Sequence, residues 1–84
     1  MKVNINAVSF DADDKLEQFV EEKVKKLERY YSDIVSTDVY LRLEKPHAVE
    51  NKLVEIRLEI PGNDLFAKKQ TQTFEEGVNQ CVSA

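Results

Sequence analysis

Apolar and polar residues alternate at the start of the chain, as they do in a β-strand with one buried face. Val3, Ile5 and Ala7 are apolar, and the asparagines between them are polar. Residues 11–31 then change to helical spacing, and Asp13 is the expected N-cap of this helix. Its apolar arc comprises Leu16, Phe19, Val20, Val24, Leu27, Tyr30 and Tyr31. Because no glycine marks its end, we expect the helix to fade over residues 30–33.

The period returns to two after the helix. Residues 35–44 and 53–60 each alternate in hydrophobicity and predict two strands. The connection over residues 45–51 is polar, contains a proline and is too long for a tight hairpin. The sequence Pro-Gly-Asn-Asp at 61–64 predicts a turn into a fourth strand over residues 65–71.

A second helix is predicted at the end of the chain. Thr73 and Glu76 have the spacing of a capping box. Its apolar stripe comprises Phe74, Val78, Cys81 and Val82. Gly77 lies inside this helix and should weaken it by roughly 1 kcal/mol relative to alanine.

These elements predict an α+β fold with the order β-α-β-β-β-α in a single domain, residues 1–84. Each helix has one apolar face, so both should pack on the same side of a four-stranded sheet and leave the other face open. The first two strands should be parallel and joined by a right-handed crossover. The expected core comprises Val3, Ile5, Leu16, Val20, Val24, Leu27, Val39, Leu41, Val54, Ile56, Leu58, Phe74, Val78 and Cys81.

The composition fits a small globular protein. Of 84 residues, 42% are hydrophobic, which is enough to form one core. A further 33% are charged, and this composition is not typical of a disordered chain. The net charge of −4 argues against a strongly basic nucleic-acid binder, although the sorting of charge matters more than its sum. The lone Cys81 is expected to be a buried thiol in a reducing cytosol. We find no signal peptide and no apolar run that would span a membrane, so we expect a cytoplasmic, monomeric domain.

Charge is sorted along the first helix, with acids early and bases late. Lys23, Lys26 and Arg29 follow one edge at intervals of three residues, and Lys25 lies beside them. Such an edge is a candidate contact for nucleic-acid phosphates. The alternative is a solvated helix face, because bases near a C-terminus suit the helix dipole and Glu21–Lys25 and Glu22–Lys26 could form ion pairs. Lys23 lacks an acidic residue at that spacing.

The open sheet face offers a second group of bases. Arg42, Arg57 and Lys68 are expected there, beside Tyr40 and Phe66. In such an arrangement the aromatic rings can stack on nucleobases while the cations contact phosphates. Acidic residues share the face, so cross-strand ion pairs are the competing and favoured interpretation. The neighbouring Lys69 should point toward the helices.

No catalytic or cofactor motif is present, and the chain does not read as an enzyme. His47 lies in a polar loop without the cysteines, second histidine or carboxylates that a metal site or a triad needs. With two glycines in the chain, a glycine-rich phosphate loop is excluded. We expect no cofactor, no metal and no small-molecule substrate.

The chain resembles the short ribosome hibernation-promoting factors, also called the ribosome-associated inhibitor or sigma-54 modulation protein family. The similarity covers essentially the whole chain. It is carried by the segments KVNINAVSF, FVEEKVKKLERYY, DVYLRLEK, VEIRLEIPGNDLFAK and TFEEGVNQCV, in that order and spacing.

The resemblance implies a fold similar to a double-stranded RNA-binding domain and a non-enzymatic inhibitor of translation. Such a protein would bind the small ribosomal subunit and its 16S rRNA in the mRNA and tRNA channel during stationary phase or stress. The rRNA-binding residues would be Lys23, Lys26, Arg29, Lys25, Arg42 and Lys68. Ala84 replaces a common lysine, and the family's basic C-terminal tail is expected to be missing.

Two other functions stay open. One is a protein-interaction module that docks through a sheet edge or the face with Tyr40 and Phe66. The other is a small acyl-phosphate hydrolase, which is disfavoured because its arginine would have to lie in a phosphate-binding loop. Here Arg29, Arg42 and Arg57 are predicted on a helix and strands.

Overall fold

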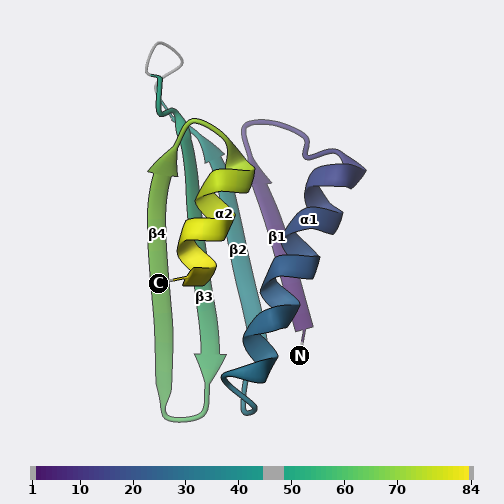
Figure 1. Ribbon diagram of the computed structural model, residues 1–84, viewed down its shortest axis with the longest axis vertical. Coiled ribbons are helices and arrows are strands. Elements are labelled where there is room, and N and C mark those ends of the chain that lie inside the picture. Colours follow the sequence, from purple (N-terminus) through teal and green to yellow (C-terminus); the bar gives the residue numbers. More distant parts are fainter. Residues whose placement is uncertain (1, 45–48, 84) are drawn as a thin grey trace.

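The computed structural model describes residues 2–44 and 49–83, and its elements follow the predicted order β-α-β-β-β-α (Figure 1). His47, whose role was considered above, lies outside the described residues. The elements are β1 (Lys2–Val8), α1 (Asp14–Lys25), the short 3₁₀ helix η1 (Lys26–Arg29), β2 (Ser36–Leu43), β3 (Lys52–Ile60), β4 (Asn63–Thr71) and α2 (Phe74–Ser83). The predicted fold class is confirmed.

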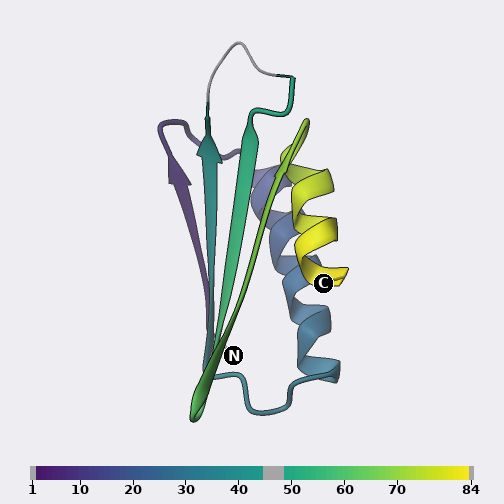
Figure 2. The ribbon, with the colours of Figure 1, turned by 90° about the vertical axis from the view of Figure 1, so that its left-hand side faces the viewer.

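The four strands lie in the order β1-β2-β3-β4. β1 is parallel to β2, and the remaining neighbours are antiparallel. Figure 2 shows both helices on one face of the sheet and no helix on the other. This confirms the predicted layers and leaves one broad sheet surface uncovered.

The core lies between the sheet and the two helices. All the predicted core residues are buried except Val3 and Ile5, which are partly buried. Both belong to the edge strand β1, which has a neighbour on one side only. Ile34 and Leu53 are buried although they were not in the predicted core. Leu53 lies on the open face, because its register partners are Arg42 and Gln70.

Both helices begin as their sequences predict. The Asp13 side chain accepts a hydrogen bond from the Leu16 N–H at 2.8 Å. The Thr73 hydroxyl accepts one from the Glu76 N–H at 3.1 Å, which is half of a capping box. The Phe10 and Phe74 rings stack with centroids 4.8 Å apart, and this contact joins the segment before α1 to the first turn of α2.

Gly77 is the point of closest approach between α2 and the sheet. A Cβ atom there would lie 2.6 Å from Val54 Cγ2 and 2.9 Å from Thr71 Oγ1. Val54 is fully buried and Thr71 nearly so. The glycine therefore lowers the intrinsic stability of the helix but allows it to pack closely on β3 and β4.

Candidate nucleic-acid interface

The edge formed by Lys23, Lys26 and Arg29, with Lys25 beside it, crosses a change in helix type, and we call these four residues the basic edge. Lys23 lies in the last turn of α1, whereas Lys26 and Arg29 lie in η1. A 3₁₀ helix has three residues per turn, so side chains three positions apart are eclipsed. Lys26 and Arg29 are therefore in line, about 6 Å apart along the axis, instead of drifting around it as in an α-helix. The edge is straighter than the sequence predicts.

Three cations of this edge are exposed and without ion-pair partners. Lys25, Lys26 and Arg29 are exposed, and none forms an ion pair with a described residue. The pairs Glu21–Lys25 and Glu22–Lys26, which the alternative interpretation allowed, are not among the ion pairs within 4.0 Å of the described residues. Such exposed pairs contribute only a few tenths of a kcal/mol, which is too little to fix long side chains. The charges stay available to an external anion.

Lys23 has an aromatic partner in place of a carboxylate. Its Nζ lies 5.5 Å from the centroid of the Phe19 ring, one turn earlier on α1. A cation over an aromatic face is favourable by about 0.5–1 kcal/mol when exposed. This contact explains how a half-buried lysine is accommodated beside the apolar arc, with its ammonium at the rim.

Two tyrosines follow the basic edge, and their exposure differs from the prediction. Helical spacing placed both on the apolar arc, but the side chains of Tyr30 and Tyr31 are 78% and 39% exposed. Both tyrosines lie beyond η1, which ends at Arg29, so helical spacing no longer determines which way their side chains face. Sequence periodicity alone gave no signal of this exposure.

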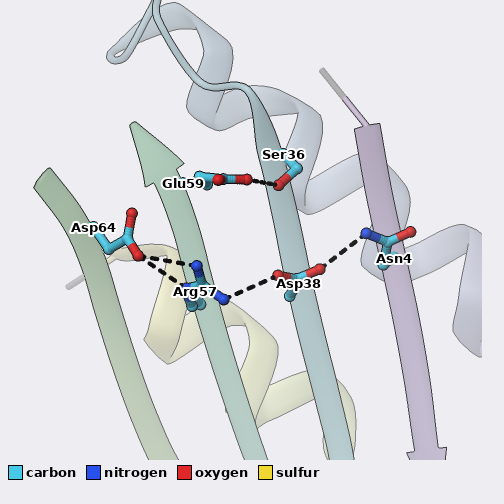
Figure 3. Close-up of polar contacts among 6 residues, drawn as sticks. All are labelled: Asn4, Ser36, Asp38, Arg57, Glu59 and Asp64. Atoms are coloured by element: carbon cyan, nitrogen blue, oxygen red, sulfur yellow. Dashed lines mark hydrogen bonds and ion pairs between the residues drawn. The ribbon is translucent and has the colours of Figure 1, made fainter. Parts of the chain in front are cut away.

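On the open sheet face, acidic residues hold Arg57. Its guanidinium lies 3.0 Å from Asp64 and 3.7 Å from Asp38, and Asp38 accepts a hydrogen bond from Asn4 at 2.9 Å (Figure 3). The chain of contacts crosses all four strands. The hydrogen bond and charge of Asp64 raise the pKa of Arg57. The favoured interpretation of this face, cross-strand pairing, is confirmed for Arg57.

Arg42 and Lys68 share that face and are exposed. Arg42 is the register partner of Leu53, and Lys68 is the partner of Glu55. No ion pair within 4.0 Å links either base to a residue in the described ranges. Lys69 is the partner of the buried Val54 and lies on the helix side, as predicted.

The six predicted contact residues consequently form two groups on opposite sides of the sheet. Lys23, Lys25, Lys26 and Arg29 lie together on α1 and η1, the helix side, while Arg42 and Lys68 lie on the open face. One flat partner surface cannot contact both groups at once. The helix group, the basic edge, is the denser one, and it forms the candidate interface.

Other chemistry is sparse in the described part of the chain. No three His, Cys, Asp or Glu side chains among residues 2–44 and 49–83 are grouped to hold a metal ion. Burial raises the pKa of the Cys81 thiol to about 11, and its Sγ lies 3.6 Å from the Val54 carbonyl oxygen. The helices in these ranges are too short or too polar to cross a bilayer.

Known proteins are similar to this chain in sequence and in fold. Residues 3–84 match the family described as sigma 54 modulation protein / S30EA ribosomal protein. A ribosome hibernation promoting factor from Azotobacter vinelandii is 34% identical over 70 residues, which are 83% of this chain and 62% of that protein. The chain therefore spans less than two thirds of the length of this curated relative.

Two solved structures have the same fold at lower sequence identity. A ribosomal subunit interface protein from Coxiella burnetii superimposes with a TM-score of 0.87 at 16% identity, over 99% of this chain and 87% of that one. The Protein Y N-terminal domain from Thermus thermophilus gives 0.82 at 20% identity, over 99% and 89%.

Proposed function

Because the chain belongs to the sigma 54 modulation protein / S30EA ribosomal protein family, we propose that it binds the small ribosomal subunit through the basic edge. Its target is the 16S rRNA of the mRNA and tRNA channel, and occupancy of that channel blocks translation during stationary phase or stress. The named relative, a ribosome hibernation promoting factor, supports a role of this kind in the cytoplasm. The expectation that the chain is not an enzyme agrees with its family.

The observation that carries the proposal is the set of cations on α1 and η1 that lack carboxylate partners in the described structure. The chain has a net charge of −4, so this cluster is a locally positive surface on a protein that is negatively charged overall. Unpaired surface cations can bind phosphates and release the counterions around RNA without first losing an internal ion pair. Arg42 and Lys68 would be a secondary contact at most, since they lie on the other side of the sheet.

The test replaces Lys23, Lys26 and Arg29 together by glutamine. The fold should persist, because Lys26 and Arg29 are exposed and glutamine is a good helix former. Cosedimentation with purified small subunits over a salt series should show a sharp loss of affinity. The slope of log affinity against log salt should flatten by roughly 2 to 3 units, at about 0.7–0.9 for each lost phosphate contact.

A matched control replaces Glu17, Glu21 and Glu28, on the acidic flank of the same helical segment, by glutamine. These side chains are also exposed, and their loss should leave binding unchanged or strengthen it. If the basic triple variant is folded and keeps both its affinity and its salt slope, the basic edge is only a solvated helix face and the assignment fails.

A protein-docking function of the open sheet face is the second candidate, and the 60% exposure of Phe66 favours it. Binding through such a surface would respond weakly to salt, because it depends on apolar contact. In the same cosedimentation assay, Phe66→Ser would then reduce binding to the small subunit more than the triple replacement of Lys23, Lys26 and Arg29 does. The opposite ranking supports the basic edge.

A further inference from the structure

The exposed ring of Tyr30 directly follows the basic edge and has no role in the core. Among the large hydrophobic side chains of the described residues, it is the most exposed, at 78%. It belongs to a shallow hollow lined by Lys26, Leu27, Tyr30, Tyr31, Val82 and Ser83. An aromatic ring and a lysine thus border one depression, beside Arg29.

The backbone under this ring is fixed to the core. The N–H groups of Tyr30 and Tyr31 both donate to the Leu27 carbonyl oxygen at 3.0 Å. Leu27 itself is buried, so its position is set by packing. The Tyr30 ring then has only its own two torsions to order on binding, which keeps the entropic cost of using it low.

Aromatic rings next to cations are the usual means by which proteins hold unpaired nucleotides. The base stacks on the ring while a lysine or arginine contacts the adjoining phosphate. Lys26 is four residues before Tyr30 and borders the same hollow, and Arg29 is next to it in sequence. Lys26 and Arg29 are without ion pairs in the described structure, so both are available for that phosphate.

We propose that Tyr30 is a stacking platform for an unpaired RNA base, with Lys26 and Arg29 holding the phosphates on either side of that nucleotide. The inference rests on the proposed function and deepens it. The basic edge supplies sequence-independent attraction, and Tyr30 adds a preference for RNA whose bases are not all stacked in a duplex.

The affinity test compares Tyr30→Phe with Tyr30→Ser by cosedimentation with small ribosomal subunits. Phenylalanine keeps a stacking face, so Tyr30→Phe should bind as the unchanged protein does. Tyr30→Ser should bind roughly 5- to 150-fold more weakly, as expected for one lost base–aromatic stack. Its salt slope should be unchanged, because no phosphate contact is removed.

Phe66→Ser is the matched control, since it removes another exposed aromatic ring from the opposite face of the sheet and should not alter binding. Thermal unfolding of each variant shows whether the fold is kept. Equal affinity of Tyr30→Ser and Tyr30→Phe, with the basic triple variant still impaired, would overturn the stacking proposal alone. Failure of the unaltered protein to bind the subunit would overturn the proposed function as well.

A second readout uses the absence of tryptophan from the chain. Tyr30→Trp places a single fluorescent ring at the platform. Protein-free 16S rRNA should quench it by base stacking, whereas inorganic polyphosphate, which has charge but no bases, should not. Quenching by neither polymer, or equally by both, contradicts the proposal.

Discussion

Leu41 shows at the scale of one residue how the sheet is held to the helices. It is fully buried in β2 and has Ala7 and Val54 as register partners on the neighbouring strands. Leu41→Ala should lower the free energy of unfolding by about 2–5 kcal/mol, because it leaves a cavity that the surrounding core fills only in part. Chemical denaturation measures this loss. Val35→Ala, at an exposed site just before β2, is the control and should change stability by less than about 0.5 kcal/mol.

The thiol of Cys81 links stability to alkaline pH. Burial raises its pKa from 9.0 to about 11, partly offset by the charge of Lys69. The unfolded chain therefore loses the thiol proton first, so the contribution of the neutral thiol is complete below pH 9.0 and disappears as pH rises toward about 11. The stability advantage of the unaltered protein over Cys81→Ala should shrink over that interval. A constant difference in denaturation free energy between pH 8 and 11 would contradict it.

Gly77 sets the distance between α2 and the sheet at the scale of an element. Gly77→Ala would gain about 1 kcal/mol of helix propensity, but its Cβ would meet Val54 Cγ2 at 2.6 Å. Relieving that overlap within a packed core costs about 1–3 kcal/mol, so we expect a net loss of stability. The midpoint of thermal unfolding should fall. A rise would mean that α2 shifts on β3 and β4 without cost.

The ends of the first helix show what a sequence can and cannot predict about an element. Asp13 was predicted as the N-cap because its side chain acts locally, and the structure confirms it. The C-terminal end depends on tertiary packing, and the change to η1 at Lys26 leaves no mark in the periodicity. Tyr30 lies beyond the end of η1, where helical spacing no longer applies, and it is exposed instead of lying on the predicted apolar arc. The change to η1 also aligned Lys26 with Arg29.

At the scale of the whole molecule, layers, strand order and most of the core followed from periodicity, because each buried face repeats every two or 3.6 residues. The partial burial of Val3 and Ile5 did not follow, since it depends on β1 being an edge strand. The six predicted contact residues were identified by their charge together with helical spacing, strand alternation and the family resemblance. Strand alternation already predicted Arg42 and Lys68 on the face opposite the helices, and the register confirms that the sheet separates them from the basic edge.

The exposed border of β4 has a consequence for the behaviour of this protein in a crowded solution. As the last strand of the sheet, β4 has a free row of backbone hydrogen-bonding groups along its outer side, onto which another extended chain could assemble. Lys68 and Lys69 point to opposite faces of that strand, so each face has a positive charge near its border. If the β4 edges of two molecules paired in an antiparallel arrangement, the lysines of one would lie close to those of the other in an interface from which water is excluded. The adjacent lysines, whatever else they bind, therefore oppose edge-to-edge aggregation.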